Sequence, residues 1–326
     1  FSIVLVIYGA GNSYVFIRGY RALPEINAVR RAYSALFLFF ALSFIIGEVT
    51  EKTGITCGNR LLVLTGSLWL AFLLYAIIFT FLVDMVRLAD LVYPFLPSAR
   101  WMAERMVPLK VMTVVAFTSF LVVTAGALSA SRPVVRIIDL YIDKHKAGEP
   151  CINVVMVSDL HLGNIVGKKK LEKLVQTINS LEPDVVLLPG DFFDENLKMV
   201  VQDDMGDVIE SIRTNYGVFA VTGNHEYIGG VDEAVEYMRK HKILVLRDEA
   251  VAVDGVLIAG REDISMNRFT DRKRQDMSYV LKGHNLDLPV ILMDHQPFNI
   301  DDSVNWNIDL HLSGHTHNGQ LWPLNY

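Results

Sequence analysis

Four long apolar stretches constrain this chain more than any other feature of its sequence. They cover residues 1–17, 32–49, 61–83 and 111–131, and Glu48 is the only charged residue within them. A helix that crosses the hydrocarbon core of a bilayer needs about 20 predominantly apolar residues, with a range near 17–25. The stretches therefore predict a bundle of four transmembrane helices within residues 1–131.

The alternative is four helices buried in the core of a large soluble protein. Composition argues against it, because a mean hydropathy of +0.32 and 52% apolar residues over 326 positions are high for an ordinary soluble chain of this size. Arginine, lysine and tyrosine residues also bracket the stretches, as they do at membrane interfaces. We therefore expect an integral membrane protein in contact with the lipid bilayer.

Positive charges in the loops predict the orientation in that bilayer. The first and third loops each hold four Lys or Arg residues, and the second holds two. The positive-inside rule then places the first and third loops in the cytoplasm and everything after residue 131 outside it. Residues 132–146 hold four further Lys or Arg residues, which count against this orientation. Cys57 and Cys151 would lie on one side, either as a disulfide or as two free thiols.

The second part of the chain has a different pattern. Residues 132–150 predict a linker, and residues 151–326 alternate short β-rich runs, such as 184–188 and 217–221, with amphipathic helices. This alternation predicts an α/β domain. Residues 132–326 carry 20 Lys and Arg against 30 Asp and Glu, so an acidic domain of this kind is not expected to bind nucleic acid.

Five short polar motifs occur in the α/β part. They are Asp159-Leu160-His161, Gly190-Asp191, Gly223-Asn224-His225-Glu226, His295 and Gly314-His315-Thr316-His317. Imidazole and carboxylate groups are ligands of Zn²⁺, Mn²⁺ and Fe²⁺, and two such ions about 3.5–4 Å apart need roughly seven ligands, one of them shared. Seven residues supply that number: Asp159, His161, Asp191, Asn224, His295, His315 and His317.

The spacing of these residues also has a structural meaning. Several of the motifs come just after a β-rich run, so we expect the ligands to lie just beyond strand ends, where open α/β sheets place their sites. In the pairs Asp159/His161 and His315/His317 the ligands are two residues apart. In extended backbone such a pair points to one side, so each pair is expected to clamp metal.

The order and content of these motifs resemble the calcineurin-like metallophosphoesterases, whose pattern is D-x-H, G-D, G-N-H-(D/E), H and G-H-x-H, over about residues 151–326. The apolar part resembles that of the bacterial multi-span transmembrane members. The resemblance implies a four-layer α/β/β/α sandwich after a four-helix transmembrane bundle, in a bacterial cell membrane; the loop charges place its catalytic domain outside the cytoplasm. It also implies two divalent metal ions, Mn, Zn or Fe, and a C-terminal end of the domain that continues beyond residue 326.

The same resemblance implies a role for each metal ligand. One metal would be held by Asp159, His161 and His317, the other by Asn224, His295 and His315, and both by Asp191. A hydroxide that bridges the metals would attack phosphorus in line, while the metals neutralise charge on the phosphoryl oxygens.

Two further residues are assigned catalytic roles in the same way. His225 would donate a proton or hydrogen bond to the leaving group, and Asp194 would orient His225. The alternative for Asp194 is the N-cap of a helix that begins near Glu195. Glu226 either fixes a ligand imidazole or lies on the surface.

These expectations lead to one function and one alternative. The chain is predicted to be a membrane-anchored dinuclear-metal phosphoesterase that hydrolyses a phosphodiester or pyrophosphate bond, with a membrane lipid as a candidate substrate. The alternative is a metal-stabilised binding or sensor module without turnover. The sequence leaves the substrate, the metals and the oligomeric state open.

Overall fold

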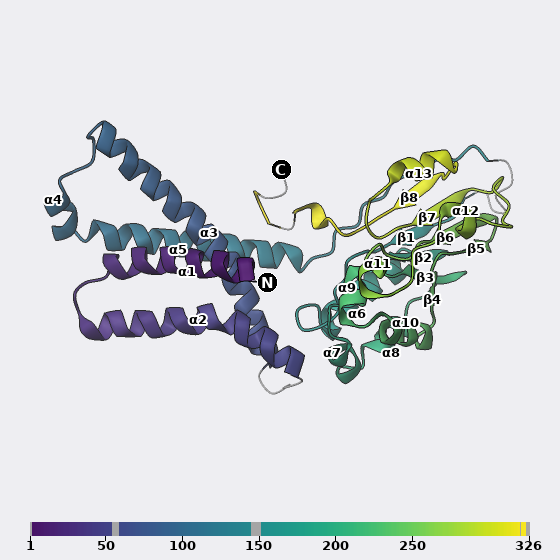
Figure 1. The fold of residues 1–326 in the computed structure, drawn as a ribbon, viewed down its shortest axis with the longest axis horizontal. Helices are drawn as coiled ribbons and strands as arrows, with labels where there is room; N and C mark the ends of the chain where they lie inside the picture. The colour runs from purple at the N-terminus through teal and green to yellow at the C-terminus, as the bar shows by residue number, and fades with distance from the viewer. Residues whose placement is uncertain (1, 54–58, 145–150, 320, 324–326) are drawn as a thin grey trace. The chain divides into compact units, whose positions relative to one another are not determined.

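The computed structural model describes residues 2–53, 59–144, 151–319 and 321–323 (Figure 1). The chain divides into two compact units, Phe1–Val134 and Val135–Tyr326, called here the helical unit and the α/β unit. The segment 133–144 contains no helix or strand. Cys57 lies outside the described residues, and so does its proposed pairing with Cys151.

The helical unit contains five helices among its described residues: α1 (Ser2–Ala22), α2 (Asn27–Thr53), α3 (Asn59–Val92), α4 (Ala99–Glu104) and α5 (Val107–Ala130). Three of them, α2, α3 and α5, are long and apolar enough to cross a membrane. These three confirm the prediction of membrane-spanning helices in the second, third and fourth apolar stretches. The first stretch forms α1, which is not among the helices that are long and apolar enough to cross a membrane.

The third helix is longer than the stretch that predicts it. Its 34 residues make a rod about 51 Å long at 1.5 Å per residue, whereas the hydrocarbon core is about 30 Å thick. The charge-free run ends at Val83, but the helix continues past Asp84 and Arg87. Asp84 accepts hydrogen bonds from Tyr14 (2.7 Å) and Arg18 (2.6 Å) of α1, so its charge is compensated.

A glycine sets the distance between α2 and α3. A Cβ on Gly66 would lie 2.4 Å from the Cα of Phe44, so only glycine allows this approach. Close contact through small residues is a common way for helices to pack within a membrane. Further along the unit, the Trp69 indole donates to the Asn12 side chain (3.1 Å) and leaves no polar group of that pair facing apolar surroundings.

The α/β unit is built on two four-stranded sheets. The first has the order β1 (Val154–Met156), β2 (Val185–Pro189), β3 (Gly217–Val221), β4 (Ile243–Val245), and its strands are all parallel. The second has the order β5 (Glu249–Val253), β6 (Val256–Gly260), β7 (Val290–Met293), β8 (Leu310–Leu312). Only β5 is antiparallel to its neighbour there. Strand β5 was not predicted, although the Asp254-Gly255 pair between β5 and β6 is a strong hairpin signal.

The sheets and helices form four layers. In β2, Val186 and Leu188 face a cluster that includes α6 (Lys168–Ser180), α8 (Met205–Glu210) and α10 (Val231–Lys240). Val185 and Leu187, which point to the opposite face, pack against residues of β6 and β7 in the second sheet. The outer face of the second sheet packs on α12 (Met277–Val280). This α/β architecture agrees with the predicted fold class of this part.

The remaining helical elements are short and lie in loops. They are α7 (Leu197–Gln202), α9 (Asn224–Gly229), α11 (Met266–Phe269), α13 (Ile300–Asn305) and the 3₁₀ turn η1 (His317–Gly319). Each of them follows the carboxyl end of a strand of the sheets within eight residues: α7 follows β2, α9 follows β3, α11 follows β6, α13 follows β7 and η1 follows β8. They therefore belong to the edge at which the polar motifs lie.

Candidate metal centre

The seven predicted donors come from loops at one edge of the two sheets. Asp159 and His161 follow β1, Asp191 follows β2, Asn224 follows β3, His295 follows β7, and His315 and His317 follow β8. The carboxyl ends of parallel strands meet at the same edge. The two sheets are joined there by His295, whose Nδ1 lies 2.9 Å from the carbonyl oxygen of Pro189 at the end of β2.

Three donors form one group, called the outer group: Asp159, His161 and His317. Their ligand atoms lie within 4.8 Å of one another. The Nε2 atoms of His161 and His317 are 3.1 Å apart, and His317 Nε2 is 3.5 Å from Asp159 Oδ1. All three side chains are half-buried, so this group is open to solvent on one side.

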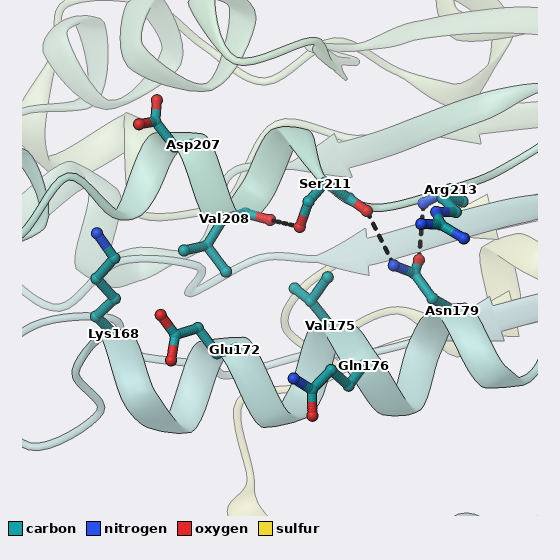
Figure 2. Close-up of a pocket in the computed structure, with 9 residues that line it drawn as sticks. All are labelled: Lys168, Glu172, Val175, Gln176, Asn179, Asp207, Val208, Ser211 and Arg213. Carbon is teal, nitrogen blue, oxygen red and sulfur yellow. Dashed lines mark hydrogen bonds between the residues drawn. The ribbon is translucent and has the colours of Figure 1, made fainter.

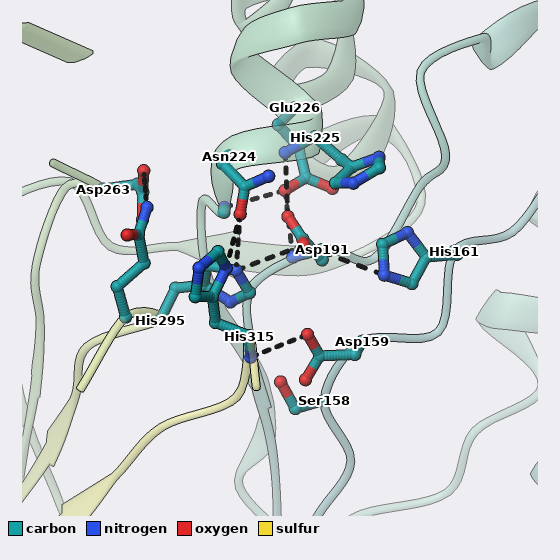
Figure 3. Close-up of polar contacts among 12 residues, drawn as sticks. Ser158, Asp159, His161, Asp191, Asn224, His225, Glu226, Asp263, His295 and His315 are labelled. Atoms are coloured by element: carbon teal, nitrogen blue, oxygen red, sulfur yellow. Dashed lines mark hydrogen bonds and ion pairs between the residues drawn. The ribbon is translucent and has the colours of Figure 1, made fainter. Parts of the chain in front are cut away.

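Three others form the inner group: Asn224, His295 and His315 (Figure 3). The Oδ1 atom of Asn224 lies 3.1 Å from His295 Nε2 and 2.8 Å from His315 Nδ1. His295 is completely buried. Because the Pro189 carbonyl accepts the proton of His295 Nδ1, the lone pair of Nε2 is directed at the group.

Asp191 lies between the two groups. Its Oδ2 atom is 3.2 Å from Nε2 of His295 and 3.7 Å from Nε2 of His161, while its Oδ1 accepts the backbone N–H of His225 at 2.9 Å. The side chain is buried. A carboxylate in this place faces donors of both groups, which is what a shared ligand of two ions requires.

The pKa shifts of the residues at the centre favour the binding of a cation. Burial acts to lower the pKa of His295, but the Asp191 carboxylate raises it to about 9 overall. Burial acts in turn to raise the pKa of Asp191, and His295 lowers it overall. Burial and the neighbouring His225 lower the pKa of His161, which favours the neutral imidazole that binds metals. A divalent cation would replace the proton beside Asp191, so the donors present fit Zn²⁺, Mn²⁺ or Fe²⁺.

The local backbone differs from the extended conformation that the sequence predicts. Asp159, His161, Asp191, His315 and His317 all have positive φ, between 46° and 70°. Such conformations are uncommon for residues other than glycine and gather at functional sites. His315 lies in the inner group and His317 in the outer group, so the extended backbone expected for that pair, with both side chains on one side, is not present.

Glycines in three motifs allow the loops to come close. A Cβ on Gly190 would lie 2.5 Å from the His295 ring, one on Gly223 would lie 2.2 Å from Asp191 Oδ1, and one on Gly314 would lie 2.0 Å from the Ser158 hydroxyl oxygen. Contacts below 3.0 Å are not compatible with a side chain at these positions. The glycines in front of Asp191, Asn224 and His315 thus make room for the donors themselves.

His225 stands beside the donors with Asp194 behind it. Its ring centroid is 4.4 Å from that of His161, and its Nδ1 is 3.3 Å from Asp194 Oδ1. The Asp194 carboxylate raises the pKa of His225, against burial, which lowers it. The alternative role of Asp194 as a helix N-cap is wrong, since Asn196 caps α7 through its bond from the Lys198 N–H.

Glu226 differs from both predictions made for it. It is buried, and its carboxylate accepts backbone N–H groups of Asp191 (3.0 Å), Phe193 (2.9 Å) and Gly223 (2.7 Å). Burial and the nearby Asp191 raise the pKa of Glu226 to about 7, against the backbone bonds, which lower it. Glu226 therefore holds two donor-bearing loops together, and it touches no imidazole through these bonds.

Residues 152–319 match the family described as Calcineurin-like phosphoesterase. That match covers more than half of the chain. The chain belongs to the calcineurin-like phosphoesterases. Members of this family use divalent metal ions, in agreement with the two groups of donors.

Relatives of this phosphoesterase include membrane proteins. An uncharacterized metallophosphoesterase of Helicobacter pylori is 31% identical over 198 residues, which cover 59% of this chain and 51% of that protein. One of Campylobacter jejuni is 26% identical over 335 residues, or 98% of this chain and 83% of that protein. A bovine transmembrane protein with metallophosphoesterase domain is 32% identical over 216 residues, or 61% and 48%. The chain spans about half the length of the first and third relatives.

Two further residues of the phosphoesterase unit support the centre, and the sequence motifs did not reveal them. Gln296, next to His295, donates from Nε2 to both carboxylate oxygens of Asp263 at 3.0 Å, and both side chains are buried. Asp263 follows β6. The bond ties the loop after β6 to the loop that carries His295. The sequence feature that could have revealed this contact is the position of Asp263, a carboxylate in the loop after β6, which is parallel to β7.

A groove of about 340 Å³ lies elsewhere on the phosphoesterase unit, between α6 and α8 (Figure 2). Asn179 bridges it at one end, donating to the Ser211 carbonyl (2.9 Å) and accepting from the Arg213 N–H (2.8 Å). Lys168 lines the other end. None of the seven donors is in its lining, so the groove is a feature of helix packing and not the metal centre.

Proposed function

We propose that the chain is a dinuclear-metal hydrolase of phosphodiester or pyrophosphate bonds, anchored in a membrane by its helical unit. The observation that carries this proposal is the convergence of seven donors in two groups that share Asp191, with His225 beside them. A protein that bound one structural ion would need about four ligands. Seven donors around a shared carboxylate suit a pair of catalytic ions instead.

The outer group would hold one ion and the inner group the other, with Asp191 contacting both. The donor set of imidazole, carboxylate and amide oxygen suits Mn, Zn or Fe. Two ions bound there would supply a Lewis-acidic centre that activates water and neutralises negative charge on the phosphoryl oxygens.

His225 is the residue left to handle the proton of the leaving group. Because Asp194 raises its pKa, the imidazolium that donates a proton persists to higher pH. The Asp194 contact at Nδ1 leaves Nε2 free to face the substrate oxygen. Glu226 keeps the loop of Asp191 and the start of α9 in register, so that His225 and the shared ligand stay at a fixed separation.

Anchoring would involve four helices. Together with the three membrane-spanning helices, α1 packs on α2, α3 and α5, and the polar Asn12 within its apolar stretch is hydrogen-bonded to Trp69 of α3. We propose residues 1–131 as the membrane domain, 132–150 as the linker and 151–326 as the catalytic domain. The positive-inside count favours an orientation with that domain outside the cytoplasm, and the resemblance to bacterial relatives supports a bacterial cell membrane.

Hydrolysis of bis-p-nitrophenyl phosphate by the purified full chain, loaded with Mn²⁺, tests the function. His225→Ala is expected to lower kcat by about 10²–10⁴-fold, the usual contribution of a general acid, while two ions per chain remain bound. His284→Ala is the matched control, because this histidine lies between α12 and β7, outside both groups. A metal-loaded wild type without turnover on any phosphoester would overturn the proposal and favour a binding module.

A further inference from the structure

Seven large apolar side chains stay exposed in loops that leave the carboxyl ends of strands in the α/β unit. They are Ile165 after β1, Ile228 after β3, Ile264 and Phe269 after β6, Phe298 and Ile300 after β7, and Trp322 after β8. The metal donors follow the same edge of the sheets. These seven residues, called here the apolar rim, follow the same strand ends as the metal donors, whereas other exposed apolar side chains, such as Leu244 and Tyr279, lie elsewhere on the unit.

Contacts within the unit hold the rim at this edge. The Phe269 ring lies 6.5 Å from the ring of Tyr227, which is two residues beyond His225 on α9. The Asp263–Gln296 bonds tie the start of the loop after β6 to the loop of His295. Phe269 is 46% exposed and Phe298 is 51% exposed. Exposed aromatic side chains held by a rigid base are a usual mark of an interaction surface.

Charge in the loop after β6, which carries Ile264 and Phe269 of the rim, is opposite to that of the domain as a whole. Residues 264–275 contain four Lys or Arg residues and one Asp, whereas residues 132–326 as a whole hold 20 basic against 30 acidic residues. Arg268, Arg272 and Lys273 are exposed, and the Arg268 guanidinium stacks over the Phe269 ring at 5.7 Å. The segment thus combines apolar and basic groups on one loop.

We propose that the apolar rim and these three basic residues dock the catalytic edge on an anionic lipid surface. Apolar side chains enter the boundary between headgroups and acyl chains, and basic side chains bind lipid phosphates. The membrane-spanning helices of the same chain keep such a surface within reach. A nucleic acid would match the basic residues, but it would leave Ile264, Phe298 and Ile300 without apolar partners.

Docking has a consequence for the substrate class. If the edge that carries the metal centre faces the headgroup layer, a phosphoester within a lipid headgroup enters without leaving the bilayer. This consequence rests on the proposed function. The docking itself does not, because it concerns binding and is measured without turnover.

The test uses the full chain in lipid nanodiscs. Cys57→Ser and Cys151→Ser remove the native thiols, and an environment-sensitive fluorophore is attached at Phe269→Cys. Lipids with a doxyl quencher on the acyl chain are added to discs of phosphatidylcholine alone or with phosphatidylglycerol. The matched control carries the label at Tyr216→Cys, an exposed position just before β3, at the opposite edge of the sheet.

Docking predicts that, in anionic discs, quenching at position 269 exceeds quenching at position 216 by about twofold or more. In neutral discs the quenching at position 269 should be weaker. Arg268→Gln, Arg272→Gln and Lys273→Gln together should reduce it similarly. Equal quenching at the two positions would overturn the proposal. So would quenching at position 269 that changes neither with the lipid composition nor with the three Gln substitutions. A label at Phe298→Cys repeats the test if the first labelled chain does not bind two Mn²⁺ ions.

Discussion

The two groups of donors differ in how deeply they are built into the molecule. In the outer group the side chains of Asp159, His161 and His317 are 12%, 19% and 26% exposed, whereas in the inner group His295 is fully buried and Asn224 and His315 are half-buried. The inner group rests on the core between the two sheets, where Met293 and Val221 are buried. The outer group rests on loops after the first and last strands of the unit.

For the pair of ions proposed above, this difference predicts two unequal positions. The inner position is held by a histidine whose orientation is fixed by the Pro189 carbonyl, and metal affinity depends on such second contacts. The outer position relies on side chains that solvent reaches. We therefore expect the inner ion to be bound more tightly and the outer ion to exchange.

The largest loss of activity is expected from a change at Asp191, the residue that both groups share. Asp191→Ala should remove both ions and lower kcat/KM for bis-p-nitrophenyl phosphate by about 10³-fold or more, as the loss of a key charge at a catalytic centre does. Activity assays and metal analysis by inductively coupled plasma mass spectrometry measure this. Two bound ions in Asp191→Ala would show that the positions are independent.

A matched pair of variants separates the two positions. His161→Ala should leave one ion per chain and weaken the other by about 10-fold or more, while His295→Ala should disturb the tight site and release both. Titration of the metal-free chain with Mn²⁺, followed by calorimetry, gives the two affinities. If both variants weaken the same binding step equally, burial does not distinguish the positions.

Removal of metal by a chelator compares the inner and outer positions without a mutation. A chelator should take the ion of the outer group first, so that the number of ions per chain falls in two phases and activity is lost in the first. Metal content and turnover followed over time in the same samples check this. A single phase would mean that the two ions leave together.

A smaller effect is expected at the residue behind the shared ligand. Glu226→Gln replaces one acceptor oxygen by an amide donor, which then faces a backbone N–H of Phe193, Asp191 or Gly223. One unmet buried donor lowers the free energy of unfolding by about 1–3 kcal/mol. Thermal unfolding of the α/β unit in detergent measures it, and an unchanged midpoint would remove Glu226 from its supporting role.

The smallest effect on stability is expected at Glu210, a surface carboxylate that contacts His241 and Lys242 and touches neither group of donors. Lys242 (2.8 Å) and His241 (3.0 Å) lower the pKa of Glu210 from 4.5. A carboxylate with a lowered folded-state pKa stabilises the fold above its unfolded value and loses that contribution as the pH falls through the folded value. Glu210→Gln should thus lower the unfolding midpoint slightly at about pH 7 and not at about pH 3. Both metal affinities should remain as in the wild type.

Much of the fold followed from local pattern. Apolar stretches predicted four membrane-spanning helices, three of which are long and apolar enough to span a membrane, and β3 (Gly217–Val221) covers the residues predicted for it. The length of α3 did not follow, because a helix continues where its hydrogen bonds continue, past the first charged residue. Strand β5 also escaped, since its pairing with β6 depends on a two-residue turn and not on an apolar run.

The sequence by itself determined which side chains can act, because ligand chemistry, apolar length and motif order are properties of residues and their spacing. The resemblance of the motifs implied how the ligands are divided, and only the tertiary structure shows which side chains meet and at what distance. His161 and His317, which are 156 positions apart, meet at 3.1 Å, while His315 and His317, two positions apart, enter different groups. The physical reason is that positive φ at the ends of parallel strands turns neighbouring side chains apart, and the packing of two sheets brings distant ones together.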